Sequence, residues 1–330
     1  MTQPEAKVLL ITGEGGLGDR SFNDAGFAGV RRALKELGVG IDLVELNEIG
    51  DLTEDTYTSA AAMKKYTLII GLGFYQDKIL NSTARKFPDQ NFMLIDAAST
   101  EPNVKGVLFR EEENAFLAGI LAAHVTQQPS LKGINKDKTI GIILGMDAPH
   151  LTRYAFSYEA GAKTVANDVN VLVDIVGNFL DRDRGKQIAL SQINKGADII
   201  YQVAGGAGLG ILDAVGKKEI YAIGEGLNQN HLHPKFIVAS TYKHMDLAVF
   251  EAIKSAMKGE FVGGNYSYGF KEGSLEVSLE GSEVSLSDEA KRALLTYKQR
   301  LIEGRTKAPL TRANLHEYLK LLIFQMTLLF

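Results

Sequence analysis

Residues 7–37 read KVLLITGEGGLGDRSFNDAGFAGVRRALKEL. Residues 7–12 form an apolar run typical of a buried strand, and residues 25–37 repeat apolar side chains at helical spacing. Between these segments lie glycines, hydrogen-bonding side chains and the aromatic ring of Phe22. In α/β proteins the loop after a parallel strand lies at the carboxyl edge of the sheet, where such folds bind ligands. The stretch therefore predicts an α/β fold with a binding loop after its first strand.

The same alternation of strand-like and helical segments continues along the chain. Strands are expected at residues 41–46, 68–71, 92–96 and 106–109, and helices at residues 56–65 and 75–87. The pattern restarts with strands at residues 139–144, 171–176, 199–203 and 221–224, and helices at residues 151–167, 184–195 and 208–217. Apolar strands separated by helices are typical of a parallel sheet covered on both faces. Two such units predict two similar lobes, and 330 residues are enough for two cores.

Two further helices are expected at residues 113–127 and 242–258. If the chain returns to the first lobe there, lobe 1 contains residues 1–119 and 240–258, and lobe 2 contains residues 120–239 and 259–330. A ligand cleft is then expected between the lobes, with hinge crossings near residues 120 and 240. Several crossings make a hinge that bends without unfolding either lobe.

The composition excludes several classes of protein. The chain contains 45% hydrophobic and 23% charged residues, which is typical of a globular protein. Its formal net charge is −4 and its basic residues are scattered, so no basic stripe favours a nucleic acid partner. It contains no cysteine, which excludes disulfides, thiolate metal sites and cysteine nucleophiles.

The two ends of the chain show no recognisable targeting or spanning segment. Residues 1–5 lead directly into the first strand, so a literal interpretation predicts a cytoplasmic protein; an exported chain without its signal would look the same. The apolar stretch 319–330 is too short to span a bilayer and contains Lys320 and Gln325. It is expected to form a helix or strand that closes a hydrophobic surface, with a peripheral membrane or subunit contact as the alternative.

An enzymatic interpretation of the glycine-rich loop is also available. Residues 13–18 match the GxGxxG pattern of dinucleotide-binding loops, and Glu45 could take the place of the acidic ribose ligand. In that fold the third glycine lies inside the first helix, whereas here residues 19–23 precede the helix expected from Ala25. The spacing thus argues against a dinucleotide-binding loop, and no group of catalytic residues is recognisable. A nicotinamide-dependent oxidoreductase stays the less favoured alternative. The ring of Phe22 among polar neighbours is better suited to stacking on a planar ligand.

The stretch GGLGDRSFND (residues 15–24) resembles the GGxGDxSFND signature of the basic membrane protein family of lipoproteins, which includes purine nucleoside receptors of ABC importers. The similarity continues in order through GLGF at 71–74, FREEENAFLAG at 109–119, GMD at 145–147, GNF at 177–179, AGGAGLG at 204–210 and Lys243. The family is similar to type I periplasmic binding proteins, in which two Rossmann-like lobes joined by a multi-strand hinge close on a ligand. The resemblance therefore implies a solute-binding receptor that is not an enzyme, with an ABC permease as partner.

The resemblance also implies the ligand-binding residues. Phe22 and Phe179 would stack on the two faces of a base, Asp19, Ser21 and Asn23 would meet polar edges, and Asp147 and Lys243 would bind ribose hydroxyls or ring heteroatoms. The predicted site is completed by Phe74, Gly206 and Gly226. Structural interpretations are also available: one of Ser21, Asn23 and Asp24 as a helix cap, Phe179 as core, Asp147 as a cap for the helix after Pro149, and Lys243 as a solvated helix residue.

One position departs from the family pattern. Residues 224–229 read GEGLNQ where the purine nucleoside receptors have a Gly-Val-Asp-Ser-Asp-Gln type segment, so Gly226 replaces the aspartate expected at the ribose. Glu225 should point to the opposite side of the strand, and Ala207 replaces the usual threonine. The expected ligand is therefore a purine nucleoside or a related aromatic heterocycle, with a free nucleobase or riboflavin (a flavin) as alternatives.

Localisation follows from the resemblance rather than from the residues. Family members are exported and anchored through a lipidated cysteine, which implies a periplasmic or cell-surface lipoprotein whose signal peptide and anchor are not present in this sequence. The membrane is then a partner only through that anchor. No cofactor and no metal ion are expected, because His231 and His233 lie in a polar loop without paired ligands nearby.

Overall fold

The computed structural model describes residues 6–327, and this part of the chain divides into two compact units. Unit 1 contains the residues up to Phe109 together with His244–Tyr268. Unit 2 contains Arg110–Lys243 together with the residues from Gly269 onward. The chain therefore passes between the units three times, after Phe109, after Lys243 and after Tyr268.

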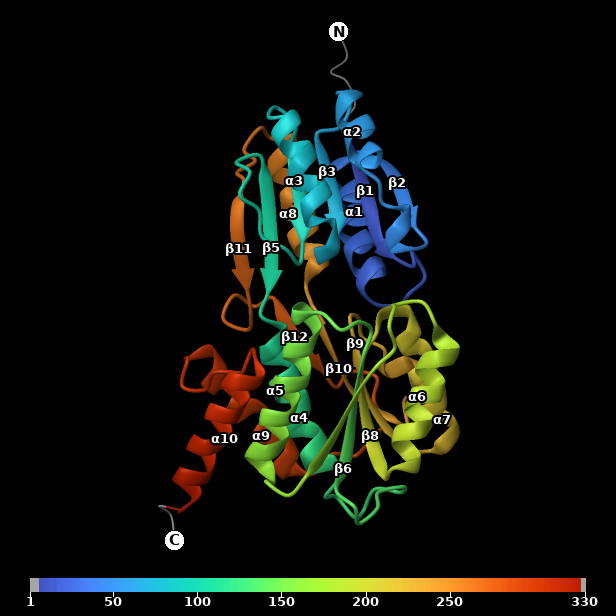
Figure 1. Ribbon diagram of the computed structural model, residues 1–330, viewed down its shortest axis with the longest axis vertical. Helices are drawn as coiled ribbons and strands as arrows, with labels where there is room; N and C mark the ends of the chain where they lie inside the picture. Colours follow the sequence, from blue (N-terminus) through green and yellow to red (C-terminus); the bar gives the residue numbers. More distant parts are fainter. Residues whose placement is uncertain (1–5, 328–330) are drawn as a thin grey trace. The chain divides into compact units, whose positions relative to one another are not determined.

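Unit 1 is built on a six-stranded sheet in the order β11-β5-β4-β3-β1-β2, in which all neighbouring strands are parallel. The strands are β1 (Lys7–Glu14), β2 (Gly40–Leu46), β3 (Leu68–Leu72), β4 (Phe92–Ile95), β5 (Val104–Phe109) and β11 (Gly264–Tyr268). The helices are α1 (Phe22–Leu37), α2 (Glu54–Ala62), α3 (Asp77–Lys86) and α8 (Met245–Met257), with 3₁₀ turns at Ile49–Asp51 and Phe74–Gln76. Helix α1 packs against α8, and α2 packs against α3 (Figure 1).

Unit 2 contains a second six-stranded sheet in the order β12-β10-β9-β8-β6-β7, parallel except for the edge pair β10–β12. The strands are β6 (Thr139–Leu144), β7 (Asn170–Ile175), β8 (Ala197–Val203), β9 (Tyr221–Glu225), β10 (Ile237–Lys243) and β12 (Leu275–Ser278). The helices are α4 (Glu111–Val125), α5 (Pro149–Val165), α6 (Arg182–Asn194), α7 (Gly208–Lys218), α9 (Asp288–Ile302) and α10 (Arg312–Thr327), with 3₁₀ turns at Gly205–Ala207 and Asn230–Leu232.

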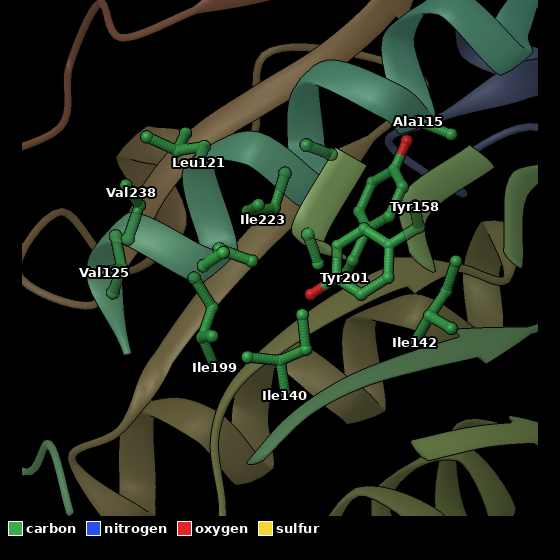
Figure 2. Packing of buried hydrophobic residues seen from close by; sticks show 14 of the residues in the cluster. Ala115, Leu121, Val125, Ile140, Ile142, Tyr158, Ile199, Tyr201, Ile223 and Val238 are labelled. Carbon is green, nitrogen blue, oxygen red and sulfur yellow. The ribbon is translucent and has the colours of Figure 1, made fainter. Parts of the chain in front are cut away.

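The core of unit 2 shows why strand β6 (TIGIIL) is apolar along nearly its whole length. Ile140 and Ile142 of β6 pack in the cluster formed with α4 and α5, whereas Ile143 packs in the cluster formed with α6 and α7. Alternate residues of a strand point to opposite faces, so a strand covered on both faces needs a continuous apolar run. Figure 2 shows Tyr158 of α5 beside Tyr201 of β8, with ring centroids 5.6 Å apart.

Three segments differ from the sequence-based expectation. Helix α1 begins at Phe22 and not at Ala25, because the preceding loop supplies a side-chain cap that the apolar spacing does not reveal. Residues 264–268 form β11 and pair with β5 in unit 1, although 259–330 had been expected in lobe 2. Helix α4 lies wholly in unit 2, where it packs against α5 and α9, so the first crossing lies at Phe109 rather than near residue 120.

The C-terminal apolar stretch is helical as far as Thr327, and residues 328–330 lie outside the described residues. Leu321, Ile323 and Phe324 are 56–63% exposed. Helix α10 packs against α5, but these three side chains do not close a hydrophobic surface within the described residues. The alternative of a membrane or subunit contact stays a prediction. Among the described helices, none has the length and apolar character needed to cross a membrane.

Candidate functional site

The carboxylate of Asp19 caps helix α1. One oxygen accepts hydrogen bonds from the backbone N–H groups of Ser21 and Asp24, at 2.9 and 3.2 Å, and the other accepts from Asn23 at 2.8 Å. Burial raises the pKa of Asp19, and the three N–H donors oppose that shift. Ser21 occupies the cap position but makes no side-chain capping bond. The capping role predicted for one of Ser21, Asn23 and Asp24 therefore belongs to Asp19.

The Asn23 side chain binds the start of the same loop, at the end of β1. Its Oδ1 accepts from the Gly13 N–H at 2.7 Å, and its Nδ2 donates to the Glu14 carbonyl at 3.1 Å. The side chain is 2% exposed, so these contacts lie in the interior of unit 1. The polar residues predicted to meet a ligand thus also make the loop rigid, while Phe22 on the same turn is only half-buried.

Glu45 binds the glycine-rich loop itself. Its Oε2 accepts a hydrogen bond from the Leu17 N–H at 2.8 Å. In the dinucleotide interpretation this carboxylate was expected at a ribose, but here it fastens β2 to the loop after β1. Phe74 follows β3 at the same edge of the sheet, is half-buried, and packs edge-to-face against Tyr75 with ring centroids 5.5 Å apart.

Asp96 is a candidate that the sequence reasoning missed. It follows β4, is 6% exposed and has φ 68°, a left-handed conformation that few non-glycine residues adopt. Its N–H donates to the Val107 carbonyl at 2.7 Å, which fixes the backbone there. Strained residues concentrate at functional sites. The only signal in the sequence was an aspartate directly after an apolar strand.

In unit 2 the ring of Phe179 lies against two glycines. A Cβ on Gly145 would be 2.4 Å from the Phe179 Cε1 atom, and one on Gly205 would be 3.3 Å from the Phe179 side chain. The Phe179 carbonyl accepts from the Ala207 N–H at 2.8 Å, which joins the loop after β7 to the 3₁₀ turn that contains the buried Gly206. Phe179 packs against the core, as its structural interpretation predicts, but it is only half-buried. Its predicted role in stacking on a ligand therefore stays a prediction.

Asp147 does not cap a helix. Helix α5 begins with Pro149, its cap position is Ala148, and no side-chain capping bond is present. Asp147 is exposed at the carboxyl end of β6. The structural interpretation of Asp147 is therefore wrong, and its predicted ligand role stays a prediction.

Gly226 has a backbone conformation that explains its identity. Its φ is 95°, and its N–H donates to the Thr241 carbonyl at 3.0 Å. An L-residue such as aspartate is strained in this region. The carboxylate of the preceding Glu225 accepts from the Tyr154 hydroxyl of α5 at 3.4 Å. Position 226, where the family pattern has the ribose-binding aspartate, therefore carries no carboxylate.

Lys243 ends β10 and is 5% exposed, so its interpretation as a solvated helix residue is wrong. Its ammonium donates to Glu111 Oε1 at 2.7 Å. The other Glu111 oxygen lies 2.7 Å from Arg153 Nη2, and His150 Nε2 lies 3.6 Å from Oε1. The sequence analysis assigned no role to Glu111, which it included only in the family motif at residues 109–119.

His231 lies in the 3₁₀ turn Asn230–Leu232, and His233 directly follows it. His231 is exposed, and the ring of His233 lies against Gly216. Within residues 6–327, neither belongs to a group of three side chains placed to hold a metal ion.

Glu112 generates a prediction about pH. Burial raises the pKa of this carboxyl to about 7, with Arg153 opposing and Glu111 adding to the shift. A folded-state pKa above the unfolded value stabilises the protein below the unfolded pKa, and this contribution is lost as the pH rises through the folded pKa. We expect the stability of the wild type relative to Glu112→Gln to fall by roughly 3 kcal/mol between about pH 4.5 and pH 8, at 1.36 kcal/mol per pKa unit.

Urea unfolding of both proteins across this pH range measures the difference directly, because all other titrating groups are shared. Parallel stability profiles for the wild type and Glu112→Gln would show that Glu112 titrates normally in the folded protein.

The comparisons with known proteins agree with this architecture. An uncharacterized lipoprotein of Pyrococcus horikoshii is 36% identical over 278 residues, or 81% of this chain and 67% of that protein. The ABC transporter nucleoside-binding protein BmpA of Lactococcus lactis is 30% identical over 328 residues, or 92% of this chain and 89% of that protein.

A solved structure is similar as well. The crystal structure of an ABC transporter system solute-binding protein from Aeropyrum pernix has a TM-score of 0.87 and 30% identity, covering 96% of this chain and 98% of that chain. This likeness confirms the predicted type I solute-binding-protein fold with two α/β lobes. The family described as "ABC transporter substrate-binding protein PnrA-like" matches residues 6–310. The chain therefore belongs to the PnrA-like family of ABC transporter substrate-binding proteins.

Proposed function

We propose that this protein is the receptor of an ABC importer for an aromatic heterocycle of the purine nucleoside class. The observation that carries the proposal is one half-buried phenylalanine at the carboxyl edge of each sheet, Phe22 after β1 and Phe179 after β7. Each ring is backed by a rigid loop, and aromatic rings stack well on planar ligands. The relative from Lactococcus lactis, named as a nucleoside-binding protein, supports the same ligand class.

The division of the chain into two units supports binding by hinge closure. Candidate residues lie on both units, and the chain passes between them three times. A ligand that contacts residues of both units has more contacts in the closed state, and so favours closure by its differential affinity. The closed form is the one we expect the permease to receive. Because a relative is a lipoprotein, we further propose that the mature protein is exported and acts at the cell surface or in the periplasm.

The sugar half of the ligand is the least supported part of the proposal. Gly226 supplies no carboxylate, and the Glu225 carboxylate accepts from Tyr154. A ribose hydroxyl buried without a partner costs about 1–3 kcal/mol. These features favour a free nucleobase or a larger ring system such as riboflavin as the second candidate.

A ligand panel tests the class. We expect a thermal shift with at least one of adenosine, guanosine, inosine, free purines or riboflavin. If the ribose lacks its carboxylate partner, a nucleoside and its base should bind within about tenfold of each other, since tenfold corresponds to 1.4 kcal/mol. Nucleosides that bind more than about a hundredfold tighter than their bases would contradict the nucleobase alternative. NAD(H) binding with turnover would contradict the receptor function.

Replacement of Phe22 by alanine tests the stacking. We expect Phe22→Ala to weaken ligand binding by roughly 5- to 150-fold in calorimetry, because stacking of a base on an aromatic side chain contributes about 1–3 kcal/mol. Phe27→Ala is the matched control: this phenylalanine is also half-buried and lies on the same helix, but it has no predicted ligand role. Equal losses in the two variants would mean that Phe22 acts only through the stability of α1.

A further inference from the structure

The first turn of α4 carries an unusually buried carboxylate. Glu111 is the first residue of this helix and directly follows the first crossing between the units. Acidic residues suit a helix N-terminus and are normally solvated there, but Glu111 is 1% exposed. A charge removed from water in this way needs cationic partners.

Its partners come from two other elements of unit 2. Lys243 is the last residue of β10, immediately before the second crossing, and its ammonium lies 2.7 Å from Glu111 Oε1. Arg153 of α5 neutralises the other oxygen from 2.7 Å. Asn114 reinforces the link, since its Nδ2 donates to the Tyr242 carbonyl at 3.1 Å. The ion pair of Glu111 and Lys243 therefore joins the first crossing to the second.

A neighbouring set of contacts joins the first crossing to the third. Arg110 Nε donates to Glu113 Oε1 at 2.6 Å, and the Phe270 N–H donates to Glu113 Oε2 at 2.9 Å. Arg110 also pairs with Glu272. This set is more exposed, with 29% of the Arg110 side chain accessible against 4% for Lys243. It provides a matched comparison on the same helical turn, without a predicted ligand residue.

We propose that Glu111 is the positioning residue for Lys243: its carboxylate holds the Lys243 ammonium in the place where the ligand is bound. The same ion pair joins the first crossing between the units to the second. The inference rests on the proposed function, because it takes Lys243 as a ligand contact. A lysine side chain has many rotamers, and holding it in place before binding removes an ordering cost from the binding step. The other carboxylate oxygen of Glu111 lies 2.7 Å from Arg153 Nη2. This second ion pair opposes a change in the Glu111 side-chain conformation when Lys243 moves.

A double-mutant cycle measures this coupling. Affinity for the compound giving the largest wild-type thermal shift is determined for Glu111→Gln, Lys243→Met and the double variant. We expect Glu111→Gln to weaken binding by roughly 5- to 100-fold, in the range of coupling between contacting residues, and to cause no further loss once Lys243 is absent. Glu113→Gln should lower thermal stability but keep wild-type affinity.

The proposal is overturned if folded Glu111→Gln binds like the wild type, or loses the same factor with and without Lys243. Should Glu111→Gln not fold, Glu111→Asp retains the charge on a side chain one methylene shorter. Reduced affinity of Glu111→Asp supports the proposal, and wild-type affinity overturns it.

Amide hydrogen exchange gives a readout that needs no ligand. We expect faster exchange at residues 240–246 in the Glu111 variants than in Glu113→Gln, and unchanged exchange would overturn the proposal. A wild-type protein that binds no member of the panel contradicts the proposed function instead. In that case the exchange result still decides whether Glu111 holds the strand that ends at Lys243.

Discussion

Parallel strands buried on both faces leave only one edge of each sheet for polar chemistry. Strand β6 illustrates the constraint, since Ile142 and Ile143 pack into opposite cores and neither face is open to a ligand. The predicted and newly identified site residues accordingly follow or end a strand: Asp19 to Asn23 after β1, Phe74 after β3, Asp96 after β4, Asp147 after β6, Phe179 after β7, Gly206 after β8, Gly226 after β9 and Lys243 at the end of β10. Each ligand-binding candidate is therefore held by the sheet from which it emerges.

The loop after β1 is held by hydrogen bonds of its own polar groups. Asp19 accepts three backbone N–H bonds, Asn23 bridges Gly13 and Glu14, and Glu45 binds Leu17. A loop that needs no ligand to close its hydrogen bonds presents its aromatic ring at little ordering cost. In unit 2 the ring of Phe179 is held by packing, because glycines at positions 145 and 205 leave room for it.

Apolar runs predicted the strands up to β9 and the two repeated units, because burial on both faces imposes such runs, whereas β10 was missed. The family was indicated instead by the resemblance of residues 15–24 and the motifs that follow them. The sequence patterns placed the start of α1 three residues late, since a cap supplied by Asp19 has no periodicity. They also missed the pairing of β11 with β5, a contact between residues more than 150 positions apart in the sequence. The role of Glu111 was hidden for a third reason: an acidic residue at a helix start looks the same whether it is solvated or buried against Lys243.

In the proposed receptor, Phe22, Phe179 and Lys243 contact one ligand. A crystal structure of the protein with its tightest-binding compound tests this claim most directly. We expect the ring system to be stacked on both phenylalanines, with the Lys243 ammonium bonded to the ligand while it keeps its contact with Glu111. A ligand bound away from these side chains, or an ammonium that leaves Glu111 to reach the ligand, would contradict the account.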